Sequence, residues 1–140
     1  MGPEQTSAAG SLDTGDGTYE VRYESFVDTS RRTGAEPNRN LPTDVYVPGG
    51  DGPFPLVVHA HGYDGSSAKF SELLGAWAEA GYVVVAPNFP LTNDGVDEAA
   101  KDLGDYVNQP ADLRFVVDSV LQMSEPGGEL EGLISPSHMG

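Results

Sequence analysis

The densest group of residues able to do chemistry is the run His59–Ser67, with the letters HAHGYDGSS. Histidine can act as a base or a metal ligand, and glycine lets the backbone come close to a bound molecule. In one interpretation, His61, Gly62 and Tyr63 form a turn whose Tyr63 N–H points at a developing oxyanion. The Tyr63 side chain would then form part of the pocket wall.

Two other interpretations of the same run stay open on local grounds. His59 and His61 are two apart on a strand and so point to one side, which is the geometry of a two-histidine metal pair. Alternatively, His59 is a buried strand residue and His61 a hydrogen-bonded turn residue. A metal site needs three or four ligands, yet the remaining histidine is the distant His138 and no acidic residue shows a recognisable ligand spacing. We therefore expect no metal and no cofactor.

The elements around this run follow from hydropathy patterns. Residues 18–27 and 43–47 alternate between apolar and polar, which predicts two strands that start a sheet in antiparallel fashion. Residues 55–60 and 81–86 are continuous apolar runs, typical of parallel strands buried on both faces. The run from His59 thus lies at the carboxyl end of a parallel strand, where α/β proteins gather ligands.

Helices are expected between and after the parallel strands. One apolar stripe lies before Gly81, which would cap the helix, and another starts at Pro110. A weaker acidic helix is expected after Asn93, with its acids on a solvated face. The first stripe is Phe70, Leu73, Leu74 and Trp77; the second is Leu113, Val116, Val117, Val120 and Leu121; the acids are Asp94, Asp97, Asp102 and Asp105.

Length and charge exclude several classes of function. The 140 residues suit about one domain, and 22 acidic against seven basic residues give a net charge of −15. This charge would repel nucleic-acid phosphates, and no apolar run approaches the roughly 20 residues that span a membrane. Residues 1–17 have no secretion-signal pattern and predict a flexible acidic tail. Location stays unknown, with acidity slightly favouring an extracellular setting.

Four consecutive segments together resemble the α/β-hydrolase family, and more narrowly esterases like dienelactone hydrolase, chlorophyllase and platelet-activating-factor acetylhydrolase. They are LPTDVYVPGGDGPFPLVVHAHGYDGSS, SELLGAWAEAGYVVVAPNFPL, VNQPADLRFVVDSVL and LISPSHMG. The resemblance implies a serine nucleophile in a Gly-x-Ser-x-Gly elbow after the fifth strand, followed in sequence by an acid and a histidine. The sequence contains no such pentapeptide. The resemblance gives Tyr63 the role of first oxyanion donor, in a turn shaped by His61 and Gly62.

We therefore expect residues 18–140 to form the N-terminal half of an α/β-hydrolase domain, with a mostly parallel sheet that is incomplete in this chain. The expected function is ester hydrolysis by acyl transfer on a small or polymeric ester. The serine would lie just beyond residue 140 or on a second polypeptide. The expected substrate-binding residues are His61, Gly62, Tyr63 and Asp64. The alternative is a noncatalytic module that binds a partner chain through an exposed sheet edge.

Overall fold

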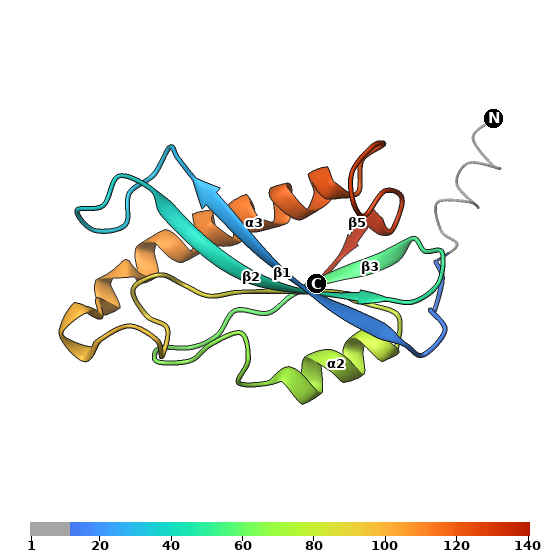
Figure 1. The fold of residues 1–140 in the computed structure, drawn as a ribbon, viewed down its shortest axis with the longest axis horizontal. Coiled ribbons are helices and arrows are strands. Elements are labelled where there is room, and N and C mark those ends of the chain that lie inside the picture. The colour runs from blue at the N-terminus through green and yellow to red at the C-terminus, as the bar shows by residue number, and fades with distance from the viewer. Residues whose placement is uncertain (1–11) are drawn as a thin grey trace.

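One mixed sheet forms the centre of the fold, in a computed structural model that describes residues 12–140 (Figure 1). Its strands lie in the order β1-β2-β4-β3-β5. β1 pairs antiparallel with β2, and β2 with β4, whereas β3 pairs parallel with both β4 and β5. The expected α/β class with an antiparallel start is confirmed. The strands are β1 Tyr19–Asp28, β2 Arg39–Pro48, β3 Phe54–Val58, β4 Val83–Pro87 and β5 Ile134–Met139.

Two α-helices cover opposite faces of this sheet, α2 Ser71–Glu79 and α3 Gln109–Met123 (Figure 1). Strand β4 lies between the two layers, and each of its residues is buried. Successive side chains of a strand point to opposite faces, so β4 serves both cores. Val83 and Val85 pack in the core that contains Val116 and Val120 of α3, and Val84 and Ala86 in the core that contains Leu74 and Ala78 of α2.

The last eight residues form part of the sheet. Residues 133–140, the segment LISPSHMG, include strand β5. Gly140 N–H donates to the Leu56 carbonyl at 2.8 Å, and Val58 N–H donates to the Gly140 carbonyl at 2.9 Å. These bonds extend the parallel part of the sheet beyond β3.

Helix α3 agrees with the prediction, since Pro110 lies in its first turn and its apolar stripe faces the core. Helix α2 turns a different face to the sheet. Leu74, Gly75 and Ala78 are buried, whereas Leu73 is 45% exposed. A Cβ at position 75 would lie 2.5 Å from the Tyr19 hydroxyl oxygen, so the small residue allows the helix to approach β1 on this side. In residues 12–140, no helix is long and apolar enough to cross a membrane.

The acidic segment after β4 contains two short 3-10 helices, η1 Glu98–Ala100 and η2 Leu103–Asn108, in place of the expected α-helix. Its apolar residues do not form a buried stripe: Leu103 is 57% and Val107 is 82% exposed. Asp102 caps η2 by accepting a hydrogen bond from Gly104 N–H. Without a buried stripe there is no packing to stabilise a longer helix.

The predicted tail lies partly outside the described residues, which begin at Leu12. Asp13 N–H donates to the Pro53 carbonyl, and the Asp13 carboxylate accepts from the N–H groups of Asp51 and Gly52 at 3.0 Å. These bonds hold residue 13 to the turn between β2 and β3. The domain boundary at residue 17 stays a prediction.

Candidate active site

The loops that follow β3 and β4 lie at one end of the sheet and are bonded to each other (Figure 1). Because the two strands are parallel neighbours, their carboxyl ends meet at the same edge. The bonds from one loop to the other are Phe89 N–H to His61 Nε2, Asp64 N–H to the Thr92 carbonyl, Asp94 N–H to the Gly65 carbonyl, Ser67 N–H to Asn88 Oδ1 and Asn88 Nδ2–H to Ser67 Oγ.

His61 is buried between these loops, with 4% of its surface exposed. Its Nε2 accepts from Phe89 N–H at 3.0 Å, and its Nδ1 lies 2.7 Å from the Gly62 carbonyl oxygen. A nitrogen that accepts carries no proton, so the tautomer is fixed with the proton on Nδ1, which donates to Gly62. Burial lowers the pKa of His61, outweighing the Gly62 hydrogen bond and Asp94, which favour the charged form. His61 is therefore a neutral residue with both nitrogens occupied.

The Gly62 carbonyl belongs to the same peptide unit as the Tyr63 N–H. Two donors bind this carbonyl, His61 Nδ1–H and Gly65 N–H, the latter at 2.9 Å. A trans peptide is planar and its C=O and N–H point in opposite directions. The Tyr63 N–H therefore points away from His61, and within residues 12–140 it has no hydrogen-bond acceptor. The Tyr63 N–H is therefore a main-chain donor available to a bound molecule, and its role as an oxyanion donor stays a prediction.

The four residues Gly62–Gly65 form a tight turn closed by the Gly65 N–H to Gly62 carbonyl bond. Asp64, the third residue, has a φ of 63°, a left-handed conformation that side chains rarely adopt. A bonded turn with positive φ only at this position is of the type II class. A Cβ at position 65 would lie 3.0 Å from the Gly62 oxygen, a tight contact, so the turn favours glycine there.

Asp64 contacts a residue that the sequence did not single out. Its Oδ1 accepts a hydrogen bond from Lys101 Nζ at 2.6 Å, and Lys101 also binds Glu98 at 2.9 Å. The Lys101 hydrogen bond lowers the pKa of Asp64. The role of Asp64 in substrate binding stays a prediction, because its carboxylate already has this partner.

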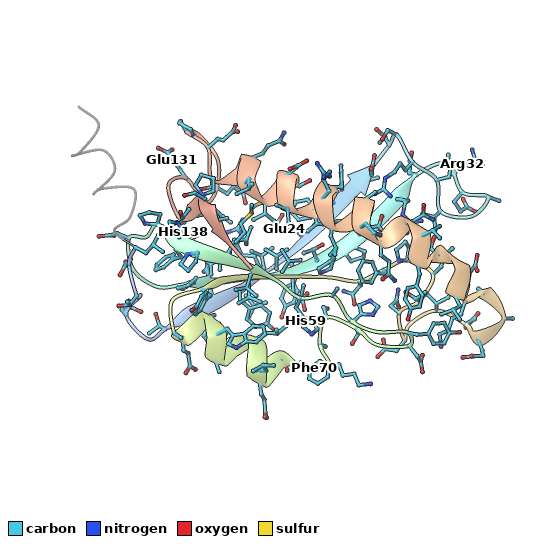
Figure 2. The ribbon with its side chains drawn as sticks, turned by 180° about the vertical axis from the view of Figure 1, so that it is seen from behind. Glu24, Arg32, His59, Phe70, Glu131 and His138 are labelled. Atoms are coloured by element: carbon cyan, nitrogen blue, oxygen red, sulfur yellow. The ribbon has the colours of Figure 1, made fainter. Side chains whose placement is uncertain are left out.

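His59 lies in a different environment from His61. Its ring meets the Phe70 ring edge-on at a centroid distance of 5.6 Å, and the two side chains are close in Figure 2. Its buried Nδ1 has no hydrogen-bond partner among the described residues, and burial lowers its pKa. A metal pair would need a free nitrogen on both histidines, whereas His61 has none. Residues 12–140 contain no group of three or more potential ligands able to hold a metal ion.

A buried charge network fixes the segment that carries Lys101 and leads into α3. Arg39 is fully buried and binds the carboxylates of Asp105 and Asp112 through two hydrogen bonds each, at 2.8 to 3.0 Å. The expectation that Asp105 lies on a solvated face is wrong, because it pairs with this arginine. Next to the network, Gln109 Nε2–H donates to Thr92 Oγ1 at 3.3 Å. The start of α3 is thereby connected to the loop after β4.

The sequence profile of the chlorophyllase family matches residues 14–113, which include the turn and both of its loops. The chain belongs to the chlorophyllase family. No curated protein sequence shows significant similarity to this chlorophyllase-family chain.

Solved structures place the chlorophyllase-family chain in the α/β-hydrolase fold. It resembles a ferulic acid esterase from Streptomyces cinnamoneus with a TM-score of 0.72 and 19% identity, over 94% of this chain and 53% of that one. A cell-wall-degrading esterase LipA from Xanthomonas oryzae aligns with a TM-score of 0.44 and 18% identity, over 94% of this chain and 35% of that one. The fold assignment rests on the first. The chlorophyllase-family chain thus spans about half the length of the ferulic acid esterase.

Proposed function

We propose that this chain supplies the oxyanion-binding half of a carboxylic-ester hydrolase, with the Tyr63 N–H as the donor. The observation that carries the proposal is the orientation of one peptide: its carbonyl is bonded on one side and its N–H is free on the other. The donor is held in place before any ligand arrives. A donor that needs no reorganisation is the kind that stabilises developing charge most.

The proposed reaction is acyl transfer to a serine. The serine oxygen attacks the ester carbonyl carbon, the carbonyl oxygen takes up the negative charge, and the Tyr63 N–H donates to that oxygen. The proposed histidine takes the serine proton during the attack and gives it to the alcohol that leaves as this intermediate collapses, and water then releases the acid from the acyl-serine. His61 is not the base, because Phe89 N–H occupies its Nε2 and its Nδ1–H is bound to Gly62.

The catalytic serine, acid and histidine are proposed to come from a continuation of the chain or from a second polypeptide. Two facts support this. The sequence has no Gly-x-Ser-x-Gly, and the chain covers 53% of the ferulic acid esterase to which it is similar in fold. Membership of the chlorophyllase family supports an ester as substrate. Tyr63, 41% exposed, suits a pocket wall that contacts an aromatic or polymeric ester.

The decisive experiment removes the donor and keeps the turn. Tyr63 is the second residue of a type II turn, a position that proline favours, so Tyr63→Pro deletes the N–H with little strain. In the full-length protein we expect kcat for p-nitrophenyl esters to fall about 10²- to 10³-fold. Tyr63→Ala, the matched control, keeps the N–H and should lose less than about tenfold. Equal activity of the two variants would contradict the role of the N–H.

A second measurement tests the serine. The full-length protein, or this chain together with its complementary polypeptide, is treated with a serine-reactive phosphonate, and the adduct is located by mass spectrometry. We expect one labelled serine and loss of esterase activity in proportion to labelling. If the protein shows no hydrolysis and no labelled serine, the proposed reaction is ruled out. Sequencing the gene beyond codon 140 gives an independent check, since the proposal with a continuation requires a Gly-x-Ser-x-Gly there.

The alternative proposal is a noncatalytic module that binds a partner chain. It draws support from β5, which is an outer strand of the described sheet, beside an apolar hollow of about 400 Å³. The hollow is lined in part by Val58, Leu113, Val117 and Met139. An edge strand can accept another strand by main-chain pairing. A partner that binds with unchanged affinity to Tyr63→Pro, together with a stop codon after residue 140, would favour this alternative.

A further inference from the structure

Asp64 occupies a position where glycine would be the easier residue. The third residue of a type II turn needs positive φ, and Asp64 has a φ of 63°. The left-handed conformation is less favourable for aspartate than for glycine, although aspartate adopts it more often than most residues, so a contact to the Asp64 side chain can shift the balance between the two turn forms. A type I turn, which needs no positive φ, would rotate the Tyr63–Asp64 peptide and turn the Asp64 N–H away from the Thr92 carbonyl, now 2.7 Å from it.

Lys101 is placed to hold this conformation. Its ammonium lies 2.6 Å from Asp64 Oδ1 and 2.9 Å from Glu98 Oε2, and its side chain is only 6% exposed. The ammonium is thus fixed by a second acid and by burial, while Asp64 is 57% exposed on its side chain and free to move without it. The left-handed form allows the Asp64 N–H to Thr92 bond, and this bond ties the turn that carries the Tyr63 N–H to the loop after β4.

We propose that Lys101 is a positioning residue for the oxyanion donor: by binding the Asp64 carboxylate, it keeps Asp64 left-handed and the Asp64 N–H on the Thr92 carbonyl, which ties the turn that carries the donor to the loop after β4. This inference rests on the proposed function for its catalytic consequence. Its structural part, that Lys101 selects the form of the turn, stands on the contacts alone. Lys101 contacts neither the substrate nor the reacting atoms.

The test first removes the Lys101 ammonium. It then replaces Asp64 by glycine, which adopts positive φ without that ammonium. In Lys101→Met, we expect the Asp64 amide to exchange with solvent about tenfold faster, since its bond to Thr92 is lost more often. We expect kcat for p-nitrophenyl esters in the full-length protein to fall about tenfold with KM changed less than twofold. Asp64→Gly adopts positive φ without strain and should keep the protection of the residue-64 amide. In the Asp64→Gly background, Lys101→Met should change neither quantity more than twofold.

Lys69, the other lysine of the chain, provides the matched control. It makes no ion pair among residues 12–140, although its charge also lowers the pKa of Asp64; Lys69→Met therefore removes a nearby charge and leaves the Lys101 hydrogen bond to Asp64 in place. Lys101→Arg, which keeps a cation, should recover at least half of the lost protection. An equal loss from Lys101→Met with and without Asp64→Gly would overturn the proposal, as would unchanged amide exchange in Lys101→Met. Faster exchange in a protein that hydrolyses no ester would refute the proposed function and leave the role of Lys101 in the turn intact.

Discussion

His61 holds Gly62 through a hydrogen bond of 2.7 Å from its Nδ1 to the Gly62 carbonyl oxygen. The proton on Nδ1 is there because the opposite nitrogen accepts from Phe89 N–H. A main-chain group after β4 therefore sets the tautomer of a side chain after β3, and that side chain sets the direction of the next peptide. The orientation of the Tyr63 N–H depends on this sequence of contacts.

The two histidines of this region should respond oppositely to replacement by phenylalanine. His61→Phe leaves the buried Phe89 N–H without an acceptor, and we expect the free energy of unfolding to fall by about 1 to 3 kcal/mol. His59→Phe removes a buried nitrogen that has no partner, and should change stability by less than about 0.5 kcal/mol or raise it. Urea unfolding at pH 7 measures both. Similar losses in the two variants would contradict the hydrogen bonds assigned to His61.

Stability should fall as the pH decreases from about 6.5. Burial lowers the pKa of His61, so the unfolded chain takes up a proton below its ordinary value of 6.5 while the folded protein does not. The unfolded state then binds more protons, and stability is lost at up to about 1.4 kcal/mol per pH unit for this one group. Urea unfolding at pH 7, 6 and 5 measures the slope. His61→Phe should reduce the slope by that amount; an unchanged slope would count against the buried neutral state.

Loss of the Arg39 charge should lower the free energy of unfolding strongly. Arg39→Met leaves the buried Asp105 without a counter-charge and Asp112 with Arg31 alone, and we expect a loss of about 3 to 5 kcal/mol in the free energy of unfolding. Arg22→Met is the matched control. Its partners Glu24 and Glu129 are partly exposed, so it should cost at most about 1 kcal/mol. Equal costs would mean that the buried network does not stabilise the start of α3.

The face of α2 can be tested with two neighbouring leucines. Leu74 is fully buried and Leu73 is 45% exposed. Leu74→Ala should therefore lower the free energy of unfolding by about 2 to 5 kcal/mol, whereas Leu73→Ala should stay within about 0.5 kcal/mol. Chemical unfolding of both variants decides between the observed face and the stripe expected from the sequence. A larger loss from Leu73→Ala would support the latter.

Local patterns were enough to predict strands β1 to β4 and helix α3, but not β5. The apolar run of β4 and the stripe from Leu113 to Leu121 each match the periodicity of their element, and both are packed in the core. The face of α2 was not predictable from large apolar residues, because its contact with the sheet uses Gly75 and Ala78. The prediction of a helix after Asn93 failed because spacing alone does not show whether apolar residues find a core.

The candidate site was predictable only in part. The HAHGYDG run indicated a turn near His61, and a hydrogen-bonded turn is found there. The residues that fix it come from elsewhere: Lys101 is 37 positions from Asp64, and Arg39 is 66 from Asp105. Pairs so far apart leave no periodic trace in a single sequence. The tautomer of His61 likewise depends on a backbone group 28 residues away.

The bonds that join the loops after β3 and β4 have a mechanical consequence. The Asp64 N–H donates to the Thr92 carbonyl, and the Thr92 hydroxyl accepts from Gln109 at the start of α3. A displacement of α3 along its axis would therefore strain the hydrogen bonds that connect it to the Gly62–Gly65 turn.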